Sequence, residues 1–357
     1  MSTAATAGSG TLSDLTAAAA ASGRMQPALR ILALSVSYLG FVYLANAYLV
    51  FWLEWPGVAA LLGDAGMLGF VAPKEPLGGS VTLAFLQIAL YPLTVVAIVV
   101  YVLRTRQRTL YADAQRLSAI GAFIARAAFW SVLLVGLADA VVSFLRVEGL
   151  LVDVVGKSLA QDLGKSAFRA QVMHLPLMAV AIAISLFTRS VGFTWLALLV
   201  VVAELQIVIL RFLYSYEQAF MADLVRFWYA ALFLFASAYT LLHEGHVRVD
   251  VLYSGFGARR RAWVNAVGAA ILGAPVCWIV MTMGLANKFS VVSGPLLSFE
   301  VTQAGFGLYV KYMLAGYLLV FAVTMLLEFM ASLLSNAGVL LEEADAPKST
   351  GESDVHH

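Results

Sequence analysis

Long apolar runs constrain this chain more than any other feature of its sequence. A helix that crosses about 30 Å of hydrocarbon needs roughly 20 predominantly apolar residues. Runs of that order lie at residues 30–53, 80–103, 119–146, 193–213, 222–242, 262–286 and 307–335, and a shorter run lies at 172–188. Hydrophobic residues make up 62% of the chain and charged residues only 12%, which is about half the charged fraction of a soluble domain. The sequence therefore predicts an all-α integral membrane protein, a polytopic bundle of about eight transmembrane helices.

Basic residues at span ends indicate whether the run at 172–188 crosses the membrane. Lys and Arg close to span ends stay predominantly in the cytoplasm. Two segments are rich in arginine: one holds Arg104, Arg106, Arg108 and Arg116, and the other holds Arg259, Arg260 and Arg261. Two segments on the same side of a membrane are separated by an even number of crossings. The number of spans between these two segments is even only if 172–188 is also a span. Both termini are then predicted to be cytoplasmic, while the nearly neutral loop at 147–171 neither supports nor opposes this count.

Charge and residue type exclude several classes of function. A formal net charge of +1, with the basic residues at span ends, argues against a nucleic-acid partner. Cys277 is the only cysteine and lies in an apolar run, which excludes an intrachain disulfide and a thiolate metal cage. His243, Glu244 and His246 are one residue short of the metalloprotease spacing. Because the sequence also has no phosphate-binding glycine loop, nucleophile elbow or paired haem ligands, it predicts no metal, no cofactor and no enzyme.

The chain contains an internal repeat. The spans at 119–146 and 193–213 share a tryptophan, an acid and an arginine at identical spacings of nine and seven residues. The matching residues are Trp130, Asp139 and Arg146 in the first copy and Trp195, Glu204 and Arg211 in the second. A weaker match pairs Phe168, Ala170, Gln171 and His174 with Phe220, Ala222, Asp223 and Arg226. Both copies cross the membrane in the same direction, which indicates a parallel duplication of two helices rather than the inverted repeat of many carriers.

The acids of this repeat have two interpretations. Seven residues at about 100° each return to within roughly 20° of the same helix side, so each acid shares a face with its arginine. A charge at mid-bilayer costs on the order of 3 kcal/mol, and Glu204 is therefore expected to face protein and find a donor there. One interpretation of Asp139 and Glu204 is an ion or proton site, and the other is a polar contact between packed helices. Arg146 and Arg211, at the outer ends of their spans, are expected to extend to the head groups.

The segment around Gly245 carries a specific resemblance. Residues 238–252 read Ala-Tyr-Thr-Leu-Leu-His-Glu-Gly-His-Val-Arg-Val-Asp-Val-Leu, followed by Tyr253-Ser254 and Ala258-Arg259-Arg260. This pattern closely resembles the small membrane subunit (DctQ-like) of TRAP transporters, the tripartite ATP-independent periplasmic carriers, and most of all their mannitol/chloroaromatic branch. The resemblance extends over about residues 193–335.

The resemblance implies roles for individual positions. Arg211 and Tyr214 match a family arginine and tyrosine after the first span, Asp223 stands in place of the usual glutamate that opens the second, and Lys311 matches the lysine that opens the last. The signature residues are implied to fix the elbow between two spans and its contact with a large membrane subunit; they are His243, Gly245, His246, Arg248 and Asp250. The three arginines at 259–261 are expected to set topology and to contact anionic lipid, or to set topology alone.

The resemblance further implies a division of labour among three proteins. A periplasmic binding protein captures an organic acid, a large membrane subunit carries it across by a sodium-driven elevator motion, and the small subunit holds the large one steady. This chain resembles the third component, a multi-pass protein of the bacterial inner membrane whose partners are the other two proteins and the lipid bilayer.

Four regions follow from these observations. They are a flexible tail at 1–29, an additional four-span region at 30–190 that is partly a repeat of the second half, the small-subunit region at 191–337, and a disordered acidic tail at 338–357. The added spans are expected to widen the stationary part of the transporter. The alternative interpretation is an autonomous carrier or channel in which Asp139, Glu204 and Lys311 line a pathway.

Overall fold

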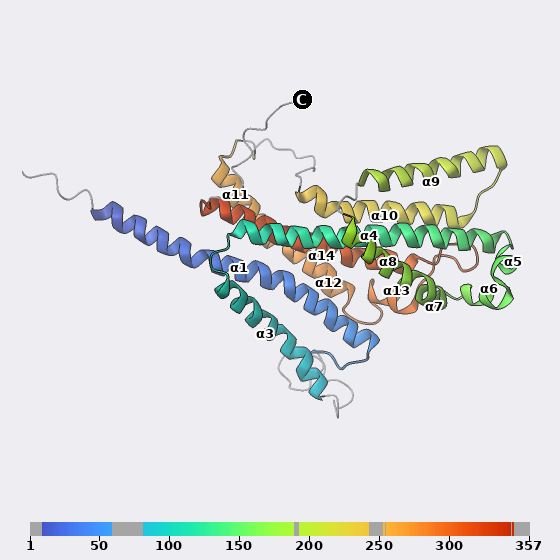
Figure 1. The fold of residues 1–357 in the computed structure, drawn as a ribbon, viewed down its shortest axis with the longest axis horizontal. Coiled ribbons are helices and arrows are strands. Elements are labelled where there is room, and N and C mark those ends of the chain that lie inside the picture. The colour runs from blue at the N-terminus through green and yellow to red at the C-terminus, as the bar shows by residue number, and fades with distance from the viewer. Residues whose placement is uncertain are drawn as a thin grey trace, which may run out of the picture.

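The computed structural model describes residues 9–58, 81–188, 193–242, 253, 255–343 and 345, with side chains described from Met25 onward except at 193–196. The described chain is helical and contains no strand, and eight of its helices are long and apolar enough to cross a membrane. They are α1 (Ser9–Trp52), α3 (Val81–Arg104), α4 (Leu110–Val147), α7–η2–α8 (Ser166–Phe187), α9 (Phe193–Tyr214), α10 (Ala219–Leu242), α11–η3–α12 (Ala258–Gly284) and α14 (Lys311–Leu340), as Figure 1 shows. The predicted all-α polytopic bundle is confirmed.

Two of these spans are interrupted by a short π-helical segment. The segment η2 (Ala170–His174) joins α7 (Ser166–Arg169) to α8 (Leu175–Phe187), and η3 (Ala269–Gly273) joins α11 (Ala258–Gly268) to α12 (Ala274–Gly284). Pro176 and Pro275 stand in the first turn after each π-helical segment. Because proline has no N–H to donate to the preceding turn, the hydrogen-bond ladder is disturbed at these places.

The short apolar run at 172–188 makes up most of a helix that is long enough to cross a membrane. The helix Ser166–Phe187 has 22 residues and begins before the predicted run. It is preceded by two short helices, α5 (Leu151–Val155) and α6 (Lys157–Leu163). Arg169, which the sequence places in the nearly neutral loop at 147–171, therefore lies in a helix, and it is completely buried. The prediction of that loop was wrong at this residue.

The helices α4 and α14 form the central pair of the bundle. They pack against each other more extensively than any other two helices, with α8 and α10 against α4, and α1, α10, α11 and α12 against α14. Two hydrophobic cores lie along this pair, one around Leu117 and Leu326 and the other around Val135 and Phe227. Gly136 permits the close approach of α4 and α10, because a Cβ at this position would lie 2.7 Å from Trp228 Nε1.

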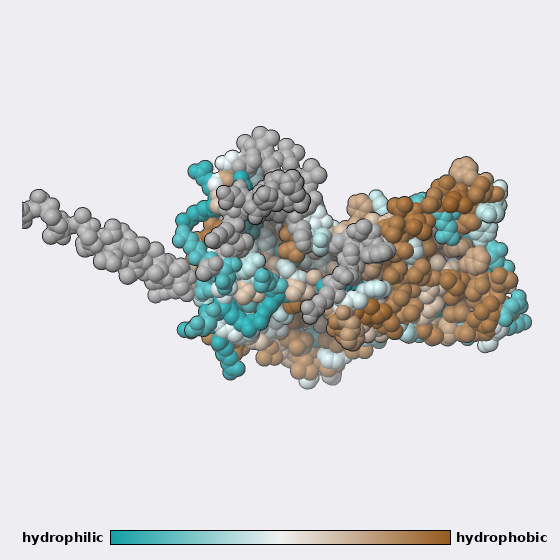
Figure 2. All heavy atoms as spheres, turned by 45° about the horizontal axis from the view of Figure 1, so that its top comes forward, coloured by the Kyte–Doolittle hydropathy of each residue, from teal (hydrophilic) through white to brown (hydrophobic). Residues whose placement is uncertain are grey.

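The helix α9 lies at the periphery. The only described helix that it contacts more than marginally is α10, and Figure 1 shows it on the outer side of α10. Only 11% of the α9 span is buried, against 39% of the α4 span. Figure 2 shows hydrophobic residues over the part of the surface where α9 and α10 lie, with hydrophilic residues toward the ends of the bundle. An apolar surface of this kind is suited to lipid or to another membrane helix.

The two arginine-rich segments lie at the same end of the bundle. Glu343, which follows α14 and a turn, accepts a hydrogen bond from Leu110 N at the start of α4. Glu342 lies 3.9 Å from Arg259 at the start of α11. These contacts agree with an even number of crossings between the two segments. The side of the membrane that this end faces stays a prediction.

The division into four regions stays a prediction, and helix ends differ from the predicted ones. The backbone is helical from Ser9, inside the predicted tail at 1–29. Thr109 accepts a hydrogen bond from Ala112 N and so starts α4 at Leu110 rather than at 119. The helix α14 begins at Lys311 rather than at 307 and extends to Leu340.

Candidate functional site

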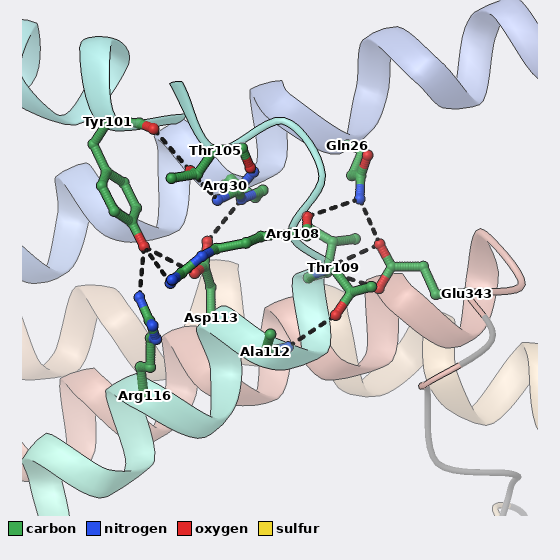
Figure 3. Close-up of polar contacts among 11 residues, drawn as sticks. Gln26, Arg30, Tyr101, Thr105, Arg108, Thr109, Ala112, Asp113, Arg116 and Glu343 are labelled. Carbon is green, nitrogen blue, oxygen red and sulfur yellow. Dashed lines mark hydrogen bonds and ion pairs between the residues drawn. The ribbon is translucent and has the colours of Figure 1, made fainter. Parts of the chain in front are cut away.

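Buried charged side chains gather in two clusters, one at each end of α4. The N-terminal cluster comprises Gln26, Arg30, Tyr101, Thr105, Arg108, Thr109, Asp113, Arg116 and Glu343 (Figure 3). The C-terminal cluster comprises Asp139, Ser143, Arg146, Arg169, His174, Asp223, Gly307, Leu308, Tyr309 and Tyr312. Each cluster joins helices from the first half of the chain to segments from the second half.

The centre of the N-terminal cluster is an ion pair between α1 and α4. Arg30 Nε lies 2.7 Å from Asp113 Oδ2, and both side chains are 1% exposed. The other two guanidinium nitrogens donate to Thr105, one to its carbonyl oxygen at 2.8 Å and one to its hydroxyl at 2.9 Å. Because all three nitrogens of the guanidinium have partners, the charge is well compensated despite its burial. The pair fixes α1, the turn after α3 and the first turns of α4 to one another.

Glu343, which follows α14 and a turn, belongs to this cluster. Its carboxylate accepts hydrogen bonds from the first backbone N–H of α4 at 2.9 Å and from Gln26 Nε2 at 2.8 Å (Figure 3). A carboxylate at a helix N-terminus is stabilised by the unpaired N–H groups and by the helix dipole. Nearby, the Tyr101 hydroxyl accepts hydrogen bonds from Arg108 and Arg116. The segment after α14 is thereby attached to α1 and α4.

The C-terminal cluster is built around Asp139. Its Oδ1 lies 2.8 Å from Arg169 Nη1 and 3.2 Å from His174 Nε2, and all three side chains are completely buried. Its Oδ2 accepts a hydrogen bond from the backbone N–H of Tyr309 at 2.7 Å. The π-helical segment places His174 so that its other ring nitrogen, Nδ1, lies 2.9 Å from the Tyr312 hydroxyl. Asp139 thus links α4, α7 and η2 to the segment that precedes α14.

That segment, residues 307–309, is held by charged groups from both halves of the chain. Asp223 of α10 accepts a hydrogen bond from Leu308 N at 3.2 Å, and Arg146 donates to the Gly307 carbonyl at 2.8 Å. The Tyr309 ring has two guanidinium neighbours, Arg169 at 4.1 Å and Arg146 at 4.5 Å from its centroid. Cation–π contacts in a desolvated place contribute up to about 2 kcal/mol each. The segment is therefore fixed through its backbone and its ring.

The structure brings together only part of the predicted intramembrane set. Asp139 and Asp223 meet at the backbone of residues 308–309, and Arg146 joins them rather than extending to head groups. Lys311 forms an ion pair with Glu300 away from these acids. Arg211 lies 3.5 Å from Glu217, and both side chains are more than half exposed.

Glu204 lies on the exposed side of α9. It has no hydrogen bond or ion pair within the described part of the chain. The expectation that Glu204 would face protein and find a donor is wrong for this chain by itself, because α9 has α10 on one side only. The repeat that pairs Glu204 with Asp139 therefore does not place the two acids in equivalent surroundings.

The signature residues of the predicted elbow lie outside the described residues; they are His243, Gly245, His246, Arg248 and Asp250. Of the three arginines that follow, Arg259 and Arg260 are exposed at the start of α11. The guanidinium of Arg261 lies 5.5 Å from the ring centroid of Tyr253.

Several residues of the two clusters were not singled out from the sequence. Arg30 and Asp113 look like ordinary residues at a span end, where arginine is expected for topology alone. Arg169 looks like one charge of a nearly neutral loop. A usable signal was present in Asp113, a lone acid among four arginines, since an aspartate is almost never fully buried unless it is paired.

The two clusters join helices through buried ion pairs and hydrogen bonds. Within the described residues, no group of three or more His, Cys, Asp and Glu side chains could hold a metal ion. In the C-terminal cluster Asp139 pairs with Arg169, and Asp223 pairs with Arg226. Removing one partner of a buried ion pair costs about 3–5 kcal/mol, so the two pairs hold α1 and α7 firmly to α4. Glu343 and residues 307–309 then join the second half of the chain to these clusters by hydrogen bonds.

A third link lies outside the spans, at the same end as the C-terminal cluster. The Tyr216 hydroxyl donates to Glu148 Oε1 at 2.7 Å and so joins the turn after α9 to the end of α4. Ser215, with φ of 52°, and the hydrogen bond from Tyr216 N to the Leu210 carbonyl end α9 in a left-handed cap. Partial burial, together with Glu148, raises the pKa of Tyr216 to about 12, so the hydroxyl stays a donor at neutral pH.

Comparison with known proteins gives one match. Residues 196–338, which cover nearly all of the last four spans, match the family described as tripartite ATP-independent periplasmic transporters, DctQ component. No curated protein and no solved structure matches the chain.

Proposed function

We propose that this chain, whose residues 196–338 form a DctQ-type small membrane subunit of a TRAP transporter, serves as the static membrane support of that transporter. The observation that carries the proposal is the family match, because DctQ is a component of a three-part carrier. The remaining four spans, from α1 to α8, precede the matched region. They are proposed to enlarge the part of the complex that stays fixed.

The two buried clusters support a static role. Arg30 and Asp113 at one end of α4, and Asp139 and Arg169 at the other, are completely or almost completely buried ion pairs. Helices that slide past each other during transport would have to expose or separate these charges, at several kcal/mol for each pair. A bundle whose helices are joined by buried ion pairs at both ends of α4 is better suited to hold a moving partner than to move itself.

The finer parts of the proposal rest on the family. The complex would take up an organic acid with sodium across the bacterial inner membrane. Its other components would be a large membrane subunit and a periplasmic substrate-binding protein, and this chain would need no cofactor and catalyse no reaction. Substrate specificity would reside in the two partners.

The signature segment 243–250 is proposed to fix the elbow after α10 and its contact with the large subunit. Asp250→Ala is then expected to reduce assembly of the complex more than insertion of this chain into the membrane. The measurement compares the amount of chain in purified membranes with the amount that co-purifies with the large subunit. If the amount of chain in membranes and the amount that co-purifies fell equally, the segment would serve only the folding of this chain.

The experiment that tests the proposed function is co-purification. The chain is expressed with and without the large membrane subunit encoded beside it, extracted in mild detergent and analysed for a stable complex. We expect one stoichiometric complex, and sodium-dependent uptake in proteoliposomes only when both membrane chains and the binding protein are present. Transport by this chain alone would contradict the proposal.

The alternative of an autonomous carrier receives little support from the geometry. Asp139 is buried in a compensated cluster, Glu204 lies on the outside of α9, and Lys311 pairs with Glu300. The three residues do not converge as a pathway would require. Conductance or uptake by the reconstituted single chain, abolished by Asp139→Asn, would restore this alternative.

A further inference from the structure

We infer that the exposed face of α9 around Glu204 is the docking surface for a transmembrane helix of the large membrane subunit, which places a cation or a hydrogen-bond donor opposite the Glu204 carboxylate. This inference rests on the proposed function. It goes beyond that function because it assigns the contact to one helix and to one charged residue.

The position of Glu204 along α9 makes exposure to lipid unfavourable. The helix runs from Phe193 to Tyr214, so Glu204 lies within one residue of its midpoint. At 1.5 Å per residue the carboxylate is about 15 Å from either helix end. A carboxylate at that depth costs on the order of 3 kcal/mol when only lipid surrounds it. A charge retained at this cost is expected to have a partner in the assembled complex.

The first copy of the repeat shows how such an acid is compensated. Asp139 receives hydrogen bonds from Arg169 and His174, which belong to the next membrane span. The same alignment of the two copies places Met221 where the first copy has Arg169, and Arg226 where it has His174. Arg226 points outward, with a side chain 62% exposed, and pairs with Asp223. The second copy has therefore kept the acid and lost the buried cation, which a partner chain would supply.

The surroundings of Glu204 suit a membrane helix. The exposed side chains nearest to it along the helix are apolar, among them Val201, Leu205, Val208 and Phe212. Arg211 shares the side of Glu204 but pairs with Glu217 outside the span. Close packing of a helix against this surface would exclude lipid from the carboxylate and strengthen a polar contact between the helices.

Charge decides which partner fits. The binding protein is periplasmic and cannot reach the centre of the membrane. A second copy docked about a two-fold axis through this face would bring two Glu204 carboxylates together, which is unfavourable for like charges. The large membrane subunit is the remaining component of the complex, and its docking helix should carry Arg, Lys or an amide at mid-membrane depth.

Two matched variants of α9 test the inference. Gln206 is also exposed on α9 and lies about 200° around the helix from Glu204. We expect Glu204→Leu to lower co-purification of the large subunit about tenfold, the size of effect of a residue in the centre of an interface. Gln206→Leu should leave it within about twofold of wild type, and neither variant should lower the amount of this chain in membranes. Equal complex formation by wild type and Glu204→Leu would overturn the inference.

Photocrosslinking separates this inference from the proposed function. A benzophenone amino acid is placed at Val208, one turn from Glu204, or at Val180, which is exposed on α8. We expect crosslinks to the large subunit from Val208 and none from Val180. Crosslinks from Val208 only to a second copy of the chain or to lipid would overturn the proposed docking surface. If the large subunit still co-purified, that result would not contradict the proposed function. Failure of the wild-type chain to co-purify would overturn the proposed function itself.

Discussion

The helices α4 and α9 carry a tryptophan, an acid and an arginine at the same spacings, yet the acid is buried in α4 and exposed in α9. In α4, Asp139 is completely buried and bonded to three donors, and Arg146 holds the segment before α14. In α9, Glu204 is exposed and Arg211 makes only a surface ion pair. The difference comes from the neighbours, since α4 is packed among α8, α10 and α14 whereas α9 has α10.

This difference teaches that a repeat in sequence does not conserve the environment of its residues. Periodicity fixes which residues share a helix face, but the helices packed on that face decide whether an acid is compensated inside the chain. In the first copy the compensation comes from Arg169, and the corresponding residue of the second copy is Met221.

The largest expected effect is at Asp139. Asp139→Ala leaves Arg169 buried without its anion, and we expect the free energy of unfolding in detergent to fall by about 3–5 kcal/mol. Glu204→Ala should change it by no more than about 0.5 kcal/mol in the isolated chain, because no described residue pairs with Glu204. Thermal unfolding of the purified variants measures both. Similar losses at the two positions would abolish the contrast between α4 and α9.

The second effect concerns close packing. Gly136→Ala places a methyl group against Trp228, and we expect a loss of about 1–3 kcal/mol from overpacking. The corresponding residue of the second copy is Val201, which is 61% exposed, and Val201→Ala should be nearly neutral. The same unfolding assay tests the pair, and a neutral Gly136→Ala would mean that α4 and α10 can separate at no cost.

The two arginines of the repeat should differ less in their effects on the free energy of unfolding. Arg146→Ala removes a hydrogen bond to the Gly307 carbonyl and a cation–π contact, for an expected loss of about 1–3 kcal/mol. Arg211→Ala removes an exposed ion pair, which contributes about 0–1 kcal/mol. Protection of backbone amides at residues 307–309 from hydrogen exchange should fall in the first variant only. Equal protection in both would show that Asp139 and Asp223 hold the segment unaided.

The smallest effect is expected at the turn that ends α9. Tyr216→Phe removes the hydrogen bond to Glu148, and we expect a loss below about 1 kcal/mol because the pair is near the surface. The neutral phenol is the donor and its pKa is raised, so this contribution should be constant below the ordinary tyrosine pKa of 10.0 and decline between that value and about 12. Unfolding of wild type and variant across that range measures it. A difference that grew toward high pH would contradict the contact.

The sequence predicted more of the fold than of the site. Local patterns predict the eight spans, the placement of the two arginine-rich segments at the same end of the bundle, and the region that resembles the family. The positions of the arginines also predicted that the short run at 172–188 belongs to a span. The site was harder because its members are far apart in the chain: Arg30 pairs with Asp113, and Tyr309 binds Asp139. No local pattern joins such residues.

What the sequence determined by itself is the number of candidate membrane-spanning helices and the type of secondary structure, because a long apolar segment in lipid can satisfy its backbone hydrogen bonds only as a helix. Within the sequence, residues 196–338 also match the DctQ family. Only the tertiary structure decided which charges are buried and paired. Burial of Asp139 and exposure of Glu204 depend on which helices pack beside α4 and α9, and that is a property of the whole bundle rather than of either helix.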